Sequence, residues 1–170
     1  MPIISTSIVL IIKRFKMIRL SRLSDYAIVL ICEMAAARDD TFSARKLHET
    51  KHISQSAIMK ILKLLASGGL VTSARGARGG YSIASEPSEI SILDIVKAID
   101  GPVSVTLCSH NTTDEPCAFE AHCTAKSGWG MVNMALQDTL SRFSVADFLA
   151  AHAAHYHINK GVRYDLSTQE

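Results

Sequence analysis

Residues 41–70 form the segment that most constrains the fold of this chain: TFSARKLHETKHISQSAIMKILKLLASGGL. Ser43 and Ser54 each stand directly before a stretch of helix-forming residues, as N-cap residues do. The second stretch ends at Gly68-Gly69 and spaces its apolar residues as one face of a helix, namely Ile58, Ile61, Leu62 and Leu65. Two short capped helices separated by a few residues are typical of a helix-turn-helix.

Residues 70–85, LVTSARGARGGYSIAS, predict a two-strand hairpin directly after that motif. Two stretches in which apolar and polar residues alternate flank a turn that is rich in arginine and glycine. The glycines permit positive φ and a close approach of the backbone to a ligand. A helix-turn-helix followed at once by a basic hairpin indicates a winged helix.

Further helices are predicted on both sides of these elements. Before them, apolar residues at helical spacing in residues 20–37 indicate a helix that Ser21 or Ser24 can cap. After them, Ser91 and Asp94 match a capping box at the start of another helix. The chain is therefore expected to be mainly α.

A longer amphipathic helix is predicted to begin with Ser127 as its cap. The residues that line its apolar face are Trp129, Val132, Leu136, Leu140 and Phe143. The polar residues that lie away from that face are Asn133, Gln137 and Asp138. A long amphipathic helix outside a compact core is suited to dimerisation, although packing against its own domain would explain the same periodicity.

The expected fold class is mainly α: a winged helix-turn-helix DNA-binding domain with a two-strand wing and a long C-terminal dimerisation helix. The chain begins with a short apolar run whose charges follow it, which matches neither a membrane span nor a signal peptide. We expect this extension to be disordered or to reflect a mis-assigned start. The extension, the winged domain, the cysteine loop, the dimerisation region and a flexible tail are expected at residues 1–17, 18–101, 102–126, 127–150 and 151–170.

The charge is distributed unevenly along the chain. Residues 1–84 carry 13 Lys and Arg against 5 Asp and Glu, a net charge of +8, whereas residues 85–170 carry 5 against 11, a net charge of −6. Halves of opposite sign indicate that the first half meets a polyanion and the second does not. Chance unevenness of solvated surface charge is the alternative.

Candidate DNA-binding residues lie on the helix-turn-helix and at the tip of the hairpin. On the second helix, the face opposite the apolar one holds Ser56, Met59, Lys60 and Lys63. Glutamine and serine can hydrogen-bond to base edges, lysine can meet phosphate or guanine, and arginine on a glycine-rich loop suits a minor groove or phosphates. A solvated basic face is the alternative for each residue taken alone. The predicted contacts are Arg45, Ser54, Gln55, Ser56, Lys60, Arg75, Gly76, Arg78 and Gly79.

Three of the four cysteines fall in residues 108–123, CSHNTTDEPCAFEAHC, at the spacing C-x8-C-x5-C. Thiolates suit zinc or an iron–sulfur cluster, but the loop lacks the closely spaced cysteine pair of most structural zinc sites. Three cysteines also fall one short of the four ligands that a cluster usually has, so His110, His122, a carboxylate, a small molecule or a second subunit would supply the fourth. Accidental free thiols are the alternative, and Cys32 is interpreted as a core residue of the first helix.

Four stretches of the sequence together resemble one known family. They are RLSRLSDYAIVLICEMA, LVTSARGARGGYSIA, SILDIVKAIDGP and the three-cysteine loop, and they extend over residues 18–149. They resemble the IscR/NsrR/RirA family of bacterial winged-helix regulators, and most of all the regulator of the SUF iron–sulfur assembly operon.

The chain is expected to be cytoplasmic. The resemblance implies a homodimer, crossed through the long helix, whose binding to promoter DNA depends on an iron–sulfur cluster on Cys108, Cys117 and Cys123. In one branch of the family a histidine three residues after the last cysteine is the fourth ligand, but this chain has Lys126 there. In another branch an acidic residue in the first helix of the partner subunit is the fourth ligand, and the matching residue is Asp25. We therefore expect Asp25 as fourth ligand, with [2Fe–2S] and [4Fe–4S] clusters both open.

The expected function is that of a cluster-sensing, DNA-binding transcription regulator, a repressor of SUF-type iron–sulfur assembly genes. A nitric-oxide- or iron-responsive repressor of the same family and a zinc-stabilised DNA-binding protein without a cluster are the alternatives. The chain is not expected to be an enzyme, because it has no Cys-x-x-Cys pair and no nucleophile–base arrangement that spacing supports. Neither membrane association nor a small-molecule substrate is expected.

Overall fold

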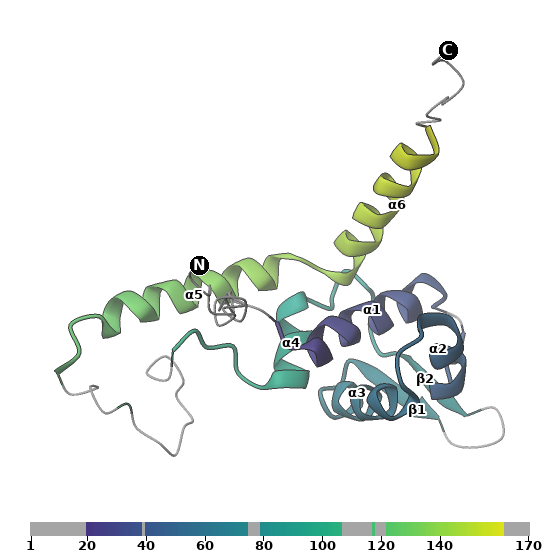
Figure 1. Ribbon diagram of the computed structural model, residues 1–170, viewed down its shortest axis with the longest axis horizontal. Coiled ribbons are helices and arrows are strands. Elements are labelled where there is room, and N and C mark those ends of the chain that lie inside the picture. Colours follow the sequence, from purple (N-terminus) through teal and green to yellow (C-terminus); the bar gives the residue numbers. More distant parts are fainter. Residues whose placement is uncertain (1–19, 39, 75–78, 107–116, 118–121, 162–170) are drawn as a thin grey trace, which may run out of the picture.

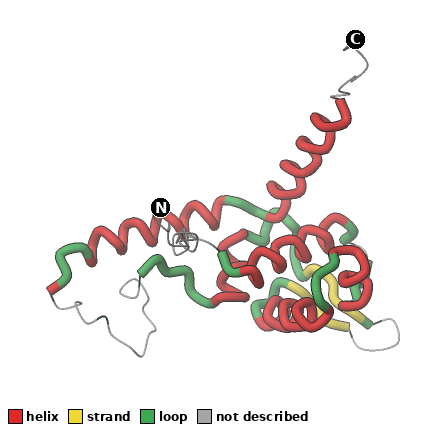
Figure 2. The backbone as a smooth tube through the Cα atoms, in the orientation of Figure 1, coloured by secondary structure: helices red, strands yellow, loops and turns green. Residues whose placement is uncertain are grey.

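The computed structural model describes residues 20–38, 40–74, 79–106, 117 and 122–161, of which 156–161 for the backbone only. The elements in chain order are α1 (Arg22–Ala36), α2 (Ala44–Lys51), α3 (Gln55–Ser67), β1 (Val71–Ala74), β2 (Gly80–Ile83), α4 (Ile92–Asp100), α5 (Lys126–Arg142) and α6 (Val145–Gly161) (Figure 1). Helices predominate, and β1 and β2 form a two-stranded antiparallel sheet (Figure 2). The expected mainly α, winged-helix fold is confirmed. None of the described helices is both long and apolar enough to cross a membrane.

Serine caps begin four of the described helices, at positions that the sequence predicts. The hydroxyls of Ser43 and Ser54 each accept a hydrogen bond from the backbone N–H three residues later, at 3.1 and 3.3 Å. Ser91 forms the full capping box with Asp94, and Ser21 is the N-cap of α1. Each cap satisfies an N–H group of the first turn that has no partner within the helix, which sets where the helix begins.

The core lies where α1, α3 and α4 pack against one another, with α2 packed on α3. The buried face of α3 is the predicted one and consists of Ile58, Ile61, Leu62 and Leu65, all without solvent exposure. Burying a side chain of this size contributes about 1.5–3 kcal/mol. Because α3 is held by one face, its opposite face can stay in solvent.

The hairpin is anchored to the residue that precedes α2. β1 and β2 pair with Ala74 opposite Gly80, and the backbones of Phe42 and Tyr81 exchange two hydrogen bonds, both of 2.8 Å. This extra bridge leaves no space beside Gly80. A methyl group there would lie 2.6 Å from Thr41 Cγ2 and 2.8 Å from the Phe42 carbonyl oxygen.

We expect Gly80→Ala to lower the free energy of unfolding by about 1–3 kcal/mol, because a backbone carbonyl cannot rotate away from the new methyl group as a side chain could. Urea denaturation would measure the change. The control is Lys63→Ala in α3, where the side chain is exposed and makes no hydrogen bond or ion pair among the described residues. There alanine is expected to change the free energy of unfolding by less than about 0.5 kcal/mol. Equal urea midpoints for the two variants would show that the Phe42–Tyr81 bridge can shift to admit the methyl group without loss of stability.

The start and the faces of α5 differ from the expectation. The helix begins at Lys126 and no side chain caps it, so the prediction that Ser127 is the cap was wrong. Asn133, expected to lie away from the packed face, is buried, whereas Trp129 and Val132 are exposed. The reason is that the C-terminal part of α5 lies beside α4, while its N-terminal part extends beyond the body of the molecule (Figure 1).

A separate helix, α6, follows where the sequence predicts one continuous region and then a tail. The Ser144 hydroxyl accepts a hydrogen bond from Asp147 N at 3.2 Å, and the Asp147 carboxylate accepts bonds from the hydroxyl and N–H of Ser144 at 2.6 and 2.8 Å. The side-chain bond and then the backbone bond from Ser144 hold the pKa of Asp147 below its ordinary value. From this cap α6 continues to Gly161, through residues expected to form a flexible tail, because their alanines favour helix.

Candidate nucleic-acid interface and cysteine loop

The face of α3 that points away from the core carries four exposed residues, Ser56, Met59, Lys60 and Lys63. Their spacing of three and four residues places them on one side of the helix, opposite the buried face. Figure 1 shows α3 and the hairpin at the same end of the body, on the side away from α5 and α6. An exposed second helix with a hairpin beside it is the geometry by which helix-turn-helix proteins meet DNA.

Several polar side chains on this face are available to a ligand. Ser54 is the least available, because its hydroxyl caps α3 and lies 3.4 Å from the Ser56 hydroxyl. Within the described part of the chain, the side chains of Gln55, Lys60 and Lys63 make no hydrogen bond or ion pair. These side chains can meet base edges and phosphates without breaking an internal contact.

Of the two basic residues in the first turn of α2, Arg45 is more available than Lys46 to contact a phosphate. It pairs with Glu49 at 2.9 Å, and both side chains are strongly exposed. An exposed pair of this kind contributes little to stability, so the guanidinium can exchange its carboxylate for a phosphate. Lys46 is more constrained, because its ammonium lies 3.0 Å from an Asp40 oxygen and 4.5 Å from the centre of the Phe42 ring.

The tip of the wing is described only in part. Gly79 lies directly before β2 and is half-buried. Arg75, Gly76 and Arg78 lie outside the described residues. Their contacts with DNA are a prediction from the sequence.

Two cysteines of the three-cysteine loop are described. Cys117 and Cys123 are half-buried and have free thiols, whereas Cys108 lies outside the described residues. Among the residues that the structure describes, no three His, Cys, Asp or Glu side chains lie close enough to hold a metal ion. The backbone N–H of Lys126 donates to the Cys123 carbonyl at 3.4 Å, which ties the last cysteine to the start of α5. His122, beside it, is exposed.

Asp25 lies in the first turn of α1 and is exposed. It borders a groove between α1 and α6, together with Val29, Cys32 and Phe148. Burial raises the pKa of the Cys32 thiol, which keeps it protonated at neutral pH, as suits a packing residue rather than a ligand. Asp25, by contrast, is exposed to solvent.

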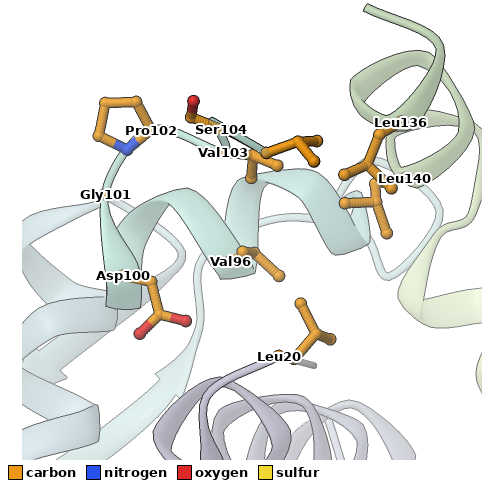
Figure 3. Close-up of a pocket in the computed structure, with 10 residues that line it drawn as sticks. Leu20, Val96, Asp100, Gly101, Pro102, Val103, Ser104, Leu136 and Leu140 are labelled. Atoms are coloured by element: carbon orange, nitrogen blue, oxygen red, sulfur yellow. The ribbon is translucent and has the colours of Figure 1, made fainter. Parts of the chain in front are cut away.

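The segment that leads from α4 to the cysteines is tied to α5. Asn133 Oδ1 accepts a hydrogen bond from Val105 N at 3.3 Å, and Gln137 Nε2 donates to the Val103 carbonyl at 2.9 Å. We call residues 102–106 with these two side chains the strap. Figure 3 shows two leucines of α5 directed toward this segment at a cavity of about 410 Å³. A displacement of the strap would therefore change its contacts with α5.

Asp100, the last residue of α4, connects the strap to α1. Its carboxylate accepts hydrogen bonds from the Ser21 and Ser24 hydroxyls, both at 2.7 Å, and Ser24 is fully buried. Figure 3 shows Asp100 at the same cavity, directly before Gly101 and the strap. The start of α1, the end of α4 and the strap thus form one connected unit between the winged helix and the cysteine loop.

Sequence reasoning missed the residues that build this unit, Asn133, Gln137 and Asp100. Asn133 and Gln137 stand four residues apart beside Leu136 and Leu140, which is a sign that all four share the packed side of one helix. For Asp100 no comparable signal exists, because its serine partners lie more than seventy residues earlier in the chain.

Residues 20–151 match the Rrf2 family, described as an iron-dependent transcriptional regulator. The chain belongs to the Rrf2 family. An rrf2-like HTH-type transcriptional regulator of Rhodobacter capsulatus is 31% identical to it over 133 residues, which cover 74% of this chain and 89% of that protein. The HTH-type transcriptional regulator IscR of Aliivibrio salmonicida is 26% identical over 125 residues, 73% of each chain.

Solved structures of Rrf2-family proteins share the fold. CymR, the global cysteine regulator of Bacillus subtilis, matches with a TM-score of 0.62 and 26% identity, over 79% of this chain and 98% of that one. IscR of T. potens matches with a TM-score of 0.59 and 24% identity, over 79% of this chain and 88% of that one, a likeness of fold alone. As a member of the Rrf2 family, this chain is a DNA-binding transcription regulator and not an enzyme.

Proposed function

We propose that this Rrf2-family chain acts in the cytoplasm as a homodimeric repressor of SUF-type iron–sulfur assembly genes and senses an iron–sulfur cluster. The observation that carries the proposal is the three-cysteine loop, because the strap that precedes it bonds to α5 and Asp100, which precedes the strap, bonds to Ser24 of α1. The family's description as an iron-dependent regulator and its IscR members support the proposal that the chain senses an iron-containing cofactor. The resemblance of the loop and of the first helix to the SUF regulator supports the choice of target genes.

The proposed DNA contact places the N-terminal half of α3 in a major groove, with α2 and the wing on the flanking backbone. The free side chains on the outer face of α3 would read bases and phosphates. Arg45 would meet a phosphate in place of Glu49. The full set of proposed contacts is the predicted one, Arg45, Ser54, Gln55, Ser56, Lys60, Arg75, Gly76, Arg78 and Gly79.

The proposed dimer forms through α5. Its N-terminal half extends beyond the body and carries four exposed large apolar side chains, Trp129, Met131, Val132 and Met134. At helical spacing these four residues lie on nearly all sides of that half, and a helix that is apolar all round is normally buried. A second copy of the chain would cover it and would place two α3 helices at a defined half-site spacing.

The proposed ligands are Cys108, Cys117 and Cys123, with Asp25 of a second copy as the fourth. Thiolates and one carboxylate fit an iron–sulfur cluster, which when bound supplies redox chemistry. The chain's own residues would couple the loop to DNA. Because the strap lies against α5, cluster binding to the loop would favour one arrangement of the two subunits. If that arrangement fits the operator differently from the other, cluster binding would change the fraction of dimers that can bind DNA.

We expect anaerobically purified protein to be brown, with visible absorption that is lost when Cys108, Cys117 and Cys123 are replaced by serine. Asp25→Ala is expected to change the spectrum, whereas His122→Ala is not, because the exposed His122 is not a proposed ligand. Anaerobic absorption spectroscopy with iron and zinc analysis would measure both. Binding to upstream DNA of iron–sulfur assembly genes, with and without cluster, would connect the spectrum to regulation.

A colourless protein with stoichiometric zinc would overturn the cluster and leave a zinc-stabilised DNA-binding protein. A spectrum that changes with His122→Ala and not with Asp25→Ala would reassign the fourth ligand. Bleaching of the cluster by nitric oxide with release of other promoters would favour a nitric-oxide-responsive repressor of the same family.

A further inference from the structure

Met59 is an apolar side chain on the exposed, otherwise polar face of α3. Among the described residues it is the one large apolar side chain that is exposed on the helix-turn-helix, at 37% of its surface, and the other exposed ones lie on or beside α1, α5 and α6. The buried face of α3 is complete without it, because Ile58, Ile61, Leu62 and Leu65 already fill the core. Met59 is therefore not part of the core-filling face of α3, and its exposed part is available to a ligand.

The surroundings of Met59 indicate what it would touch. Ser56 stands one turn before it and Lys63 one turn after it, with Lys60 adjacent, all on the same exposed side of α3. Two lysines without an ion pair among the described residues oppose a contact with the same face of a second copy, because like charges repel. The two lysines instead favour contact with a polyanion such as DNA. An apolar group beside these lysines would then find its partner in an apolar feature of that polyanion.

Within a major groove, the C5-methyl group of thymine is the apolar feature of the base edges. Met59 is the fifth residue of α3, in the N-terminal half, the part of a recognition helix that contacts base edges. A methionine side chain is unbranched and polarisable, and it adapts to irregular apolar surfaces. We infer that Met59 reads a thymine in each half-site of the operator by contact with its C5-methyl group. This inference rests on the proposed binding of DNA by α3.

Removing single methyl groups from DNA would test the contact. The operator is first selected from random-sequence duplexes, and each thymine is then replaced by deoxyuridine, singly and in symmetric pairs. Fluorescence anisotropy at constant salt measures the dissociation constants. For wild-type protein, one thymine in each half-site is expected to matter, with about four-fold weaker binding for one lost methyl group and roughly 16-fold for the symmetric pair.

The variants assign the effect to Met59. Met59→Ala is expected to bind the thymine and deoxyuridine operators equally, and Met59→Leu to keep most of the difference. Lys63→Gln is the matched control on the same face: it should weaken binding to both operators and leave their ratio unchanged. Thermal melting of each variant checks that the winged helix is intact.

Wild-type protein that binds its operator with no sensitivity to any thymine methyl would overturn the inference and leave the DNA-binding function intact. A sensitivity that persists in Met59→Ala would likewise overturn it, because another residue would then be the reader. Wild-type protein that selects no DNA at all would overturn the proposed function itself, and this inference with it.

Discussion

Replacing both Met131 and Met134 with glutamate is expected to convert the protein into a monomer and to weaken its binding to a two-half-site operator by at least 100-fold. The two side chains are 63% and 65% exposed on the part of α5 that extends beyond the body. Since the single chain buries little of either residue, the substitutions remove almost nothing that holds the monomer together. In a dimer, four carboxylates would be placed in an apolar interface, where an unpaired charge is costly.

The loss of affinity follows from the linkage of two binding units. Holding two α3 helices in one dimer makes the second half-site contact intramolecular, which strengthens binding by about 10²–10⁴-fold without a new contact. A monomer forfeits this gain. Sedimentation equilibrium would measure the oligomeric state, and anisotropy on the full operator and on a single half-site would measure the two affinities.

The control for this variant is Ser88→Glu, which adds a negative charge at an exposed turn before α4. It should leave the protein dimeric and its DNA affinity nearly unchanged. A Met131→Glu, Met134→Glu protein that remains a dimer at micromolar concentration would show that α5 is not the interface, and the packing of this helix on its own domain would then be its whole role.

The elements that the sequence predicts well are those set by local chemistry. Ser43, Ser54 and Ser91 cap the helices that follow them because each cap bonds an N–H only three residues later. The apolar residues of α3 recur at helical spacing, so its buried and exposed faces follow from the sequence alone. The paired hairpin is equally local, since its two strands are separated only by the arginine-rich turn.

What the sequence could not predict depends on contacts between distant segments. Periodicity assigns Trp129 to an apolar face, but whether that face is covered depends on how far α5 extends past α4. Asn133 is buried where it accepts a hydrogen bond from Val105 of the strap, and although its spacing within α5 hints at the packed side, this partner 28 residues earlier is not visible in the sequence. Likewise, Asp100 meets the two serines of α1 only because α1 and α4 pack side by side.

Replacing Lys60 and Lys63 with glutamine is expected to weaken operator binding by roughly 10³-fold at about 0.1 M salt, if each lysine meets one phosphate in each half-site. Four contacts per dimer would then be lost. Each phosphate contact contributes about 0.9 to the slope of log affinity against log salt, so the slope should become shallower by about 3.6. Titrations at several salt concentrations would measure both quantities.

The sequence dependence of the loss separates two roles for these lysines. Phosphate contacts carry no base information, so their removal weakens binding to specific and random duplexes alike, whereas a lysine that meets guanine would relax specificity at one base pair. Lys97→Gln on α4 is the control, since it removes an exposed positive charge that belongs neither to the helix-turn-helix nor to the wing and should leave the slope unchanged. An unchanged slope in the α3 variant would show that this face does not contact DNA. Lysines that contact phosphates displace counterions from the DNA, so their removal must change the slope.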